Sequence, residues 1–183
     1  MAPRKLYVIN PNNLDSVTRA IDTALKSFSG ISGLAIECLT VKDGPPGLHG
    51  LRERLVAPVL GIGECAMLTA CTLGQRIGVI AISSQAIPRH LRYYGAMGLS
   101  GRIARERAID LDVSQSTNSQ LALGSMVEIA RRLRDEDGAD VIVMGCAGMA
   151  AMRAPLEDAV GLPVVEPCQV AVGMAIGAIL SRG

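Results

Sequence analysis

The chain has 183 residues, of which 49% are hydrophobic, and its 18 Lys and Arg against 17 Asp and Glu leave a formal charge of +1. This length and apolar content are typical of one large or two small domains with a buried core, and they argue against a disordered chain. With three Tyr, one Phe and no Trp, the chain lacks the rings and the basic excess that nucleic-acid binding needs. We therefore expect no nucleic-acid partner.

Two segments bear on the location of the protein. The longest apolar stretch, residues 164–180, contains a Glu, a Pro and a Gln near its start. It therefore falls short of the roughly 20 uninterrupted apolar residues of a membrane span and predicts a buried helix. Residues 1–5 are basic but lead directly into a strand-like run at 6–9, without the apolar region of a secretory signal. We expect a cytoplasmic protein with no membrane partner.

Strand and helix signals alternate through the first half of the chain. Short apolar runs predict strands, and apolar residues at helical spacing predict helices. The predicted strands are residues 6–9, 34–41 and 58–63, and the predicted helices are residues 17–25, 48–55 and 64–73. Two prolines and two glycines within residues 42–47 predict an irregular loop.

The second half repeats this alternation. Strands are predicted at residues 77–82, 109–113, 141–144 and 161–165, and helices after the Ser83-Ser84 pair, at 122–133 and at 169–180. Strands that alternate with helices predict an α/β fold with a mostly parallel sheet flanked by helices. In such sheets, ligands bind beyond the carboxyl ends of the strands.

Three predicted strand ends carry polar or nucleophilic groups. Asn10 ends the first strand, Ser83 and Ser84 follow the strand at 77–82, and Cys146 follows the strand at 141–144. These positions are the candidate ligand-binding residues of the chain.

Cys146 is the most informative of these residues. A cysteine between a buried strand and a helix start lies where backbone N–H groups stabilise a thiolate, which acts as a nucleophile or a base. Gly145 and Gly148 allow close backbone approach to a ligand, and the N–H groups here, including that of Ala147, are suited to a carboxylate or imide oxygen. The alternative is a buried thiol that only fills space, since free cysteine is often buried.

The other cysteines and the histidines favour structural roles. We expect Cys38, Cys65, Cys71 and Cys168 to pack in the interior, with Cys65 the first candidate for an exception. The odd number of cysteines and their spacing predict neither disulfides nor a metal site. His49 and His90 are expected at the surface. The arginines between residues 89 and 107 predict a solvated face rather than an anion site.

No nucleotide cofactor is expected either. The Gly61-Ile62-Gly63 stretch lacks the third glycine of a dinucleotide fingerprint, and no Gly-Lys-Ser/Thr motif occurs in the chain.

Three segments together resemble a known family. They are Val-Ile-Asn-Pro-Asn at 8–12, Pro-Val-Leu-Gly-Ile-Gly-Glu at 58–64, and Met-Gly-Cys-Ala-Gly-Met at 144–149. The chain is similar to the hydantoin/allantoin racemase branch of the aspartate/glutamate racemase superfamily, and the resemblance covers nearly its whole length.

The resemblance implies two similar α/β lobes with the active site in the cleft between them. The expected division is residues 1–75 plus 163–183 for one lobe and residues 76–162 for the other. It implies an isomerase without cofactor or metal, in which a cysteine from each lobe transfers a proton on one face of the substrate. Cys146 matches the second-lobe cysteine, and Asn10, Ser83 and Ser84 match positions that hold the substrate. Related enzymes associate, so a homo-oligomer is expected.

The chain departs from the family pattern in its first lobe. No cysteine precedes Pro46-Gly47-Leu48, where the family pattern places one. In the family pattern, a helix and a strand lie between two separate loops. Here the single loop at 42–47 takes the place of both loops, so that helix and strand, on the order of 30 residues, are missing. We hypothesise that a segment is omitted from this sequence, because a parallel lobe without it would leave buried surface uncovered. An intact mass of 19.1 kDa would contradict this hypothesis.

The expected function is racemisation of a small carbonyl compound, above all a hydantoin or allantoin. Two alternatives stay open. One is an arylmalonate-type decarboxylase, which needs only the single thiol of Cys146, and the other is a non-catalytic protein that binds a small metabolite.

Overall fold

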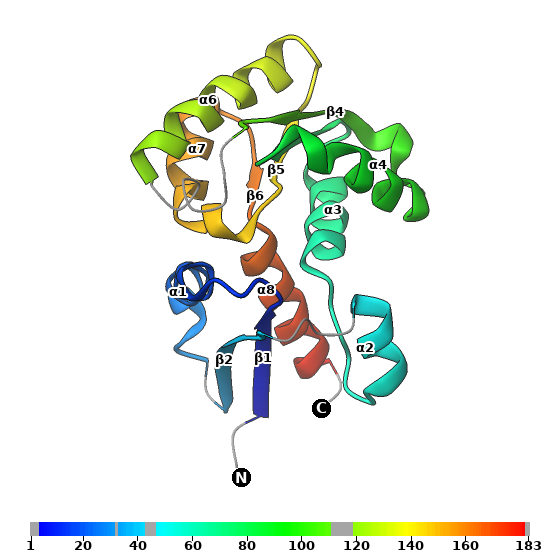
Figure 1. The fold of residues 1–183 in the computed structure, drawn as a ribbon, viewed down its shortest axis with the longest axis vertical. Coiled ribbons are helices and arrows are strands. Elements are labelled where there is room, and N and C mark those ends of the chain that lie inside the picture. Colours follow the sequence, from blue (N-terminus) through cyan, green and yellow to red (C-terminus); the bar gives the residue numbers. More distant parts are fainter. Residues whose placement is uncertain (1–3, 32, 43–46, 111–118, 182–183) are drawn as a thin grey trace.

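The computed structural model describes residues 4–31, 33–42, 47–110 and 119–181, which form two parallel sheets (Figure 1). The smaller sheet pairs strands β1 (Arg4–Asn10) and β2 (Leu34–Thr40). The larger sheet has the order β4 (Ile103–Ala108), β3 (Ile77–Ala81), β5 (Val141–Met144) and β6 (Val164–Val165). The predicted parallel α/β class is confirmed.

The two central strands of the larger sheet, β3 and β5, are buried along their whole length. Alternate side chains face opposite sides of a strand. Those on one side pack with helices α6 (Ser119–Asp135) and α7 (Arg153–Val160). Those on the other side pack with α3 (Ile62–Leu73) and α4 (Ile87–Ala96). Helices on both faces explain why these strands are apolar runs without alternation.

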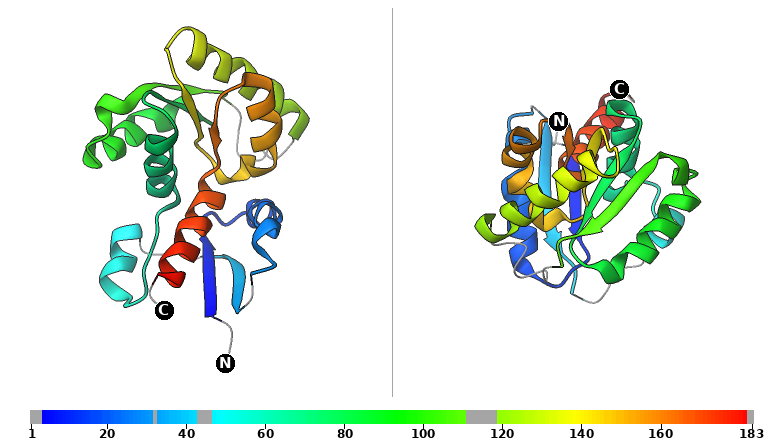
Figure 2. Two further views of the ribbon diagram at one scale, coloured as in Figure 1. Left: turned by 180° about the vertical axis from the view of Figure 1, so that it is seen from behind. Right: turned by 90° about the horizontal axis from the view of Figure 1, so that it is seen from above.

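Helix α8 (Pro167–Leu180) connects the two sheets. It begins directly after β6 and runs beside β1, as the views from two sides show (Figures 1 and 2). Its residues Cys168 and Val172 share a core with Val17 and Ile21 of α1 (Asp15–Ala24) and with the small sheet. The carboxyl ends of β1 and β2 therefore face the carboxyl ends of β5 and β6 across the middle of the molecule (Figure 1).

The remaining described elements are short. They are α2 (Leu48–Arg54) and the 3-10 helices η1 (Lys26–Phe28), η2 (Ser84–Ala86), η3 (Ser100–Arg102) and η4 (Ala147–Met152).

Two predicted strands are wrong. Residues 58–61 have no regular structure and α3 begins at Ile62, because the carbonyl of Val59 accepts a hydrogen bond from Arg52 Nε (2.9 Å) instead of joining a sheet. The strand expected at 109–113 lies at 103–108, where the exposed Arg105 and the half-buried Arg107 hide the apolar signal. Asp110 has φ +50°, a left-handed conformation outside the β region of regular strands. Residues 111–113 lie outside the described part.

The division into lobes at residues 1–75 plus 163–183 and 76–162 stays a prediction. The structure adds that β6 pairs with β5, and that α3 packs on the larger sheet, whereas α8 packs with the small sheet. No helix in the described ranges is long and apolar enough to cross a membrane.

A fully buried carboxylate begins helix α8. Glu166 accepts hydrogen bonds from the backbone N–H groups of Cys168 (3.0 Å) and Gln169 (2.7 Å), so it caps the helix. Burial raises the pKa of Glu166, against the lowering effect of these bonds. At pH values between the ordinary pKa of a glutamate and the raised pKa of Glu166, the folded chain thus holds a proton that the unfolded chain has lost. Stability therefore falls as pH rises through this window.

We expect Glu166→Gln to remove this pH dependence. Relative to the variant, the wild type should lose up to about 1.4 kcal/mol of unfolding free energy per pH unit above pH 4.5, until the raised pKa is passed. Urea unfolding between pH 4.5 and 8 measures this difference. Glu53→Gln, at an exposed position of α2, is the control and should follow the wild type. Parallel stability curves for Glu166→Gln and wild type would contradict the expectation.

Candidate active site at the strand ends

Cys146 lies where the central strand β5 ends. The preceding Gly145 donates its N–H to Ile80 O of β3 (2.8 Å), and Cys146 O accepts from Met149 N (3.2 Å) in the first turn of η4. The Cys146 side chain is half-buried and packs at the edge of the core that α6 and α7 share. The structure thus confirms the predicted order of buried strand, cysteine and helical turn.

Gly145 is required by the packing of the sheet. A Cβ atom at this position would lie 2.5 Å from Ile80 O and 3.4 Å from the Cα of Ala81. No side chain fits between β5 and β3 at this position. The close backbone approach that glycine permits is therefore the approach of Gly145 to β3.

The ends of β3 and of its neighbour β4 also contribute polar groups. Ser83 Oγ accepts from Gln85 N (3.3 Å) and so caps η2, whereas Ser84 donates its N–H to Asp110 Oδ1 (2.9 Å). Asp110 follows β4, and Ile109 N donates to Ala81 O (3.0 Å). Our sequence reasoning missed Asp110, although an Asp beyond a strand tolerates the left-handed conformation and often ends regular structure.

Asn10 stands at the end of β1 and is buried. Its Nδ2 donates to Thr18 Oγ1 (2.9 Å) and Leu14 O (3.4 Å), and its Oδ1 accepts from Asn12 N (3.0 Å). Both amide hydrogens are therefore engaged, and one acceptor site on Oδ1 remains. Asn10 holds the loop before α1 in shape.

Cys168 lies near Cys146, and Cys38 lies near Cys168. Burial raises the pKa of Cys168, and the charges of Glu166, Cys146 and Cys38 raise it further. Burial, with Asp22 as the second cause, raises the pKa of Cys38 to about 11. Cys168 and Cys38 share the core beneath α1, which agrees with the structural role predicted for them. Cys65, the predicted exception, is buried and its pKa is also raised by burial.

These environments predict selective alkylation. At pH 8, a thiol of pKa about 11 is ionised in about one molecule in a thousand, and only the thiolate reacts. We expect iodoacetamide to modify Cys146 before Cys38, Cys65 and Cys168, with half-buried Cys71 as the internal reference. Peptide mapping after brief labelling measures this order. Modification of Cys168 ahead of Cys146 would contradict it.

Of the arginines expected on a solvated face, Arg89, Arg92 and Arg105 are exposed, whereas Arg102 and Arg107 have structural contacts. Arg102 donates to the carbonyls of Cys71 (3.3 Å), Gly74 (2.6 Å) and Gln75 (2.8 Å) at the end of α3. Arg107 pairs with Asp137 (2.6 Å) and Glu136 (2.7 Å). In the described residues, no three His, Cys, Asp or Glu side chains lie so that they could hold a metal ion.

The fold and these strand ends define a class of protein: a parallel α/β protein with two facing sheets and a cysteine at the end of a central strand. The family model for Asp/Glu/Hydantoin racemase matches residues 29–175. The chain belongs to the Asp/Glu/hydantoin racemase family.

Individual relatives agree with this assignment. A hydantoin racemase from Rhizobium meliloti is 34% identical over 158 residues, which cover 84% of this chain and 62% of that protein. The chain thus spans less than two thirds of that relative. A hydantoin racemase from Pseudomonas sp. (strain NS671) is 28% identical over 204 residues, covering 88% of this chain and 80% of that protein. That alignment is longer than this whole chain, so the relative carries residues without a counterpart here.

The fold also matches solved structures. The crystal structure of an allantoin racemase from Pseudomonas fluorescens superimposes with a TM-score of 0.89 at 25% identity, covering 97% of this chain and 92% of that chain. Of the expected gap at residues 42–47, residues 43–46 lie outside the described part of this chain.

Proposed function

We propose that the chain is a racemase that inverts the carbon beside a carbonyl in a small cyclic compound, most closely a hydantoin or allantoin. The position of Cys146 at the carboxyl end of the central strand carries the proposal. The similarity to hydantoin racemases and to an allantoin racemase supports the substrate class.

In the proposed mechanism, the thiolate of Cys146 removes the proton from the stereocentre. The C–H bond breaks, an S–H bond forms, and the electron pair moves onto the adjacent carbonyl as an enolate. A proton donor on the opposite face completes the inversion, and in the reverse direction the Cys146 thiol is that donor. The N–H groups of Ala147 and Gly148 and the polar groups of Ser83, Ser84 and Asn10 bind the carbonyl and imide groups of the substrate.

The second proton-transfer group belongs to the first lobe. The family pattern places a cysteine there, before Pro46-Gly47-Leu48, and we propose that the segment hypothesised near residues 42–47 supplies it. The N-terminal sheet supports this arrangement, because the ends of β1 and β2 face the ends of β5 and β6 (Figure 1).

Cellular location and assembly follow as further proposals. None of the five cysteines forms a disulfide, which fits a reducing cytoplasm. Large apolar side chains are exposed on α3 and α8, namely Leu68, Leu73, Met174 and Leu180, and they suit a contact between subunits. Light scattering coupled to gel filtration tests the homo-oligomer.

The decisive experiment uses a single hydantoin enantiomer in D₂O at neutral pH. A racemase is expected to abolish the optical rotation and to place solvent deuterium in the inverted product, while the unconverted substrate keeps its proton at early times. A sample without protein corrects for spontaneous racemisation.

The decarboxylase alternative is favoured by one observation. Of the thiols in the described part of the chain, Cys146 alone lies within two residues of the carboxyl end of a strand of the larger sheet. A single thiol can transfer a proton on only one face of the substrate. One face is enough to protonate an enolate after loss of CO₂. Deuterium exchange with retention of configuration, together with turnover of an arylmalonate, would contradict the racemase and support the decarboxylase.

A further inference from the structure

Asp110, just beyond the carboxyl end of β4, has an unusual backbone. Among the described residues it is the only non-glycine residue with a positive φ, +50°. Such a conformation costs free energy for a residue with a Cβ atom, and it persists only where the surrounding structure imposes it. Residues held in this way gather at functional sites. The backbone at Asp110 is therefore expected to serve the contact that its side chain makes.

The side chain of Asp110 holds the turn that follows the neighbouring strand β3. Its Oδ1 accepts the backbone N–H of Ser84 (2.9 Å). The next N–H, that of Gln85, is accepted by Ser83 Oγ (3.3 Å), and Ala86 N donates to Ser83 O (3.1 Å). All three N–H groups of η2 are thus engaged within the chain. The groups of this turn that remain to donate to a ligand are the two serine hydroxyls.

This turn lies beside Cys146. Strand β3 has β5 on one side and β4 on the other, and Gly145 N donates to Ile80 O (2.8 Å) at the end of β3. The turn therefore stands between the end of β4 and the cysteine. Neighbouring strands are about 4.8 Å apart, so Asp110 lies roughly 10 Å from the end of β5, too far to exchange a proton with a substrate carbon at Cys146. Asp110 thus acts on the site through the turn that it holds.

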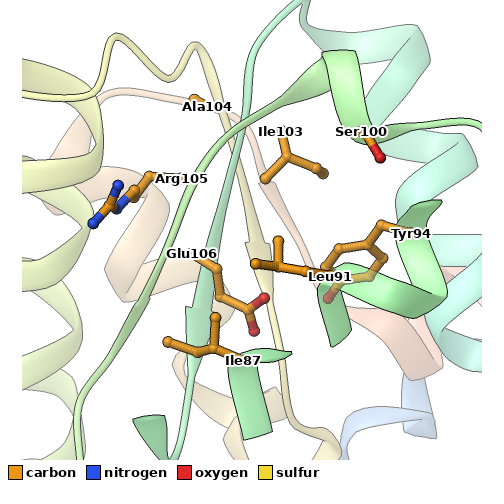
Figure 3. Close-up of a pocket in the computed structure, with 8 residues that line it drawn as sticks. All are labelled: Ile87, Leu91, Tyr94, Ser100, Ile103, Ala104, Arg105 and Glu106. Carbon is orange, nitrogen blue, oxygen red and sulfur yellow. The ribbon is translucent and has the colours of Figure 1, made fainter. Parts of the chain in front are cut away.

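Apolar packing does not by itself fix the segment that begins with this turn. The turn leads through η2 into α4, and a cavity of about 570 Å³ lies between α4 and β4 (Figure 3). Ile87, the first residue of α4, lines this cavity together with Leu91 and with Ile103 of β4. The start of α4 therefore depends on polar contacts with β4 more than on packing.

Glu106 of β4 makes one of these polar contacts. Its side chain is fully buried and is directed toward Ile87 and Leu91 (Figure 3). Its Oε1 lies 2.6 Å from His90 Nδ1 on α4, so His90, expected at the surface, is partly buried instead. Oε2 is buried without a hydrogen-bond partner among the described residues, which costs stability. The chain around β4 thus holds this segment at two points, the helix through Glu106 and the turn through Asp110.

We propose that Asp110 is a positioning residue of the active site, which fixes the turn at Ser83 and Ser84 so that their hydroxyls stay within reach of a substrate at Cys146. This inference rests on the proposed racemase function. It assigns the hydrogen bonds from this strand end to side-chain hydroxyls rather than to backbone N–H groups. Without the carboxylate, Ser84 N loses its acceptor and the turn is no longer held in one position. The substrate then binds more weakly, while Cys146 still exchanges the proton of a bound substrate.

Three variants separate the backbone conformation of Asp110 from its hydrogen bond. Asparagine tolerates a positive φ and keeps an oxygen acceptor, glycine tolerates it without an acceptor, and alanine offers neither. We expect Asp110→Asn to keep the wild-type KM for a single hydantoin enantiomer within about twofold, because the two side chains are equivalent acceptors for backbone N–H groups. Asp110→Gly should raise KM roughly tenfold, and Asp110→Ala at least as much, with kcat within about threefold of wild type.

Asp140→Ala is the matched control. The Asp140 carboxylate also accepts backbone N–H groups, those of Gln75 (3.0 Å) and Arg76 (2.8 Å), but at the amino end of β3. This variant should lower the free energy of unfolding in urea at least as much as Asp110→Gly does, yet leave KM unchanged. An unchanged KM in Asp110→Gly, or an equal rise of KM in Asp140→Ala, would show that Asp110 has a structural role only and would overturn the proposal.

Failure of the proposed racemase function gives a different result. If the wild type does not racemise the hydantoin, calorimetric titration of the same hydantoin measures its dissociation constant for the wild type and for each variant. A constant raised in Asp110→Gly but not in Asp110→Asn or Asp140→Ala would support the positioning role at a binding site without racemisation. Equal constants, or no binding by the wild type, would overturn the positioning role together with the proposed function.

Discussion

Replacing Cys146 with alanine is expected to slow the racemisation of a single hydantoin enantiomer by roughly 10²–10⁴-fold. The thiol is the group that we propose to exchange the proton at the stereocentre, and alanine has none. The change removes a half-buried side chain at the edge of the core, so the fold should persist. Loss of optical rotation at a fixed substrate concentration measures the rate, and circular dichroism checks the fold.

Two variants accompany this measurement. Cys146→Ser keeps the shape but carries a far weaker acid and base, so it should be nearly as slow as the alanine variant. Cys71→Ala removes a half-buried thiol from α3, away from the strand ends, and should keep the wild-type rate. Unchanged turnover by Cys146→Ala would exclude the cysteine mechanism, whereas an equal loss in Cys71→Ala would point to a general effect of thiol removal.

Gly145→Ala is expected to lower the free energy of unfolding by about 2–3 kcal/mol and to reduce turnover as well. The new Cβ would lie 2.5 Å from the backbone oxygen of Ile80. Backbone atoms cannot rotate aside as a side chain does, so β3 and β5 must separate at their ends. The hydrogen bond from Gly145 N to Ile80 O lengthens, and the adjacent Cys146 moves with it. Urea unfolding measures the stability.

Gly173→Ala is the matched control for this change. Gly173 lies inside α8, and a Cβ there meets no atom within 4 Å. Alanine favours a helix over glycine by up to about 1 kcal/mol, so this variant should be as stable as the wild type or more stable. If Gly145→Ala retained full stability, the two strands would not be in the close contact described above.

Local sequence patterns were enough for much of the fold. The strands at β3 and β5 are continuous apolar runs because both of their faces are buried, and such runs are visible without any knowledge of neighbours. The same holds for Cys146, whose place after an apolar strand depends only on adjacent residues. Strand β4 was misplaced because it lies at the edge of its sheet, where Arg105 and Arg107 interrupt the apolar signal.

The composition and length argued against a nucleic-acid partner at the outset, and the order of motifs indicated the family and a thiol at residue 146. Only the tertiary structure decided which distant residues meet. Ser84 with Asp110, His90 with Glu106, and Cys168 near Cys146 are separated by 16 or more residues along the chain. Such contacts depend on how helices pack against a sheet, which no local pattern encodes. The same reason explains why a buried half-satisfied carboxylate at Glu106 could be recognised only after folding brought α4 over β4.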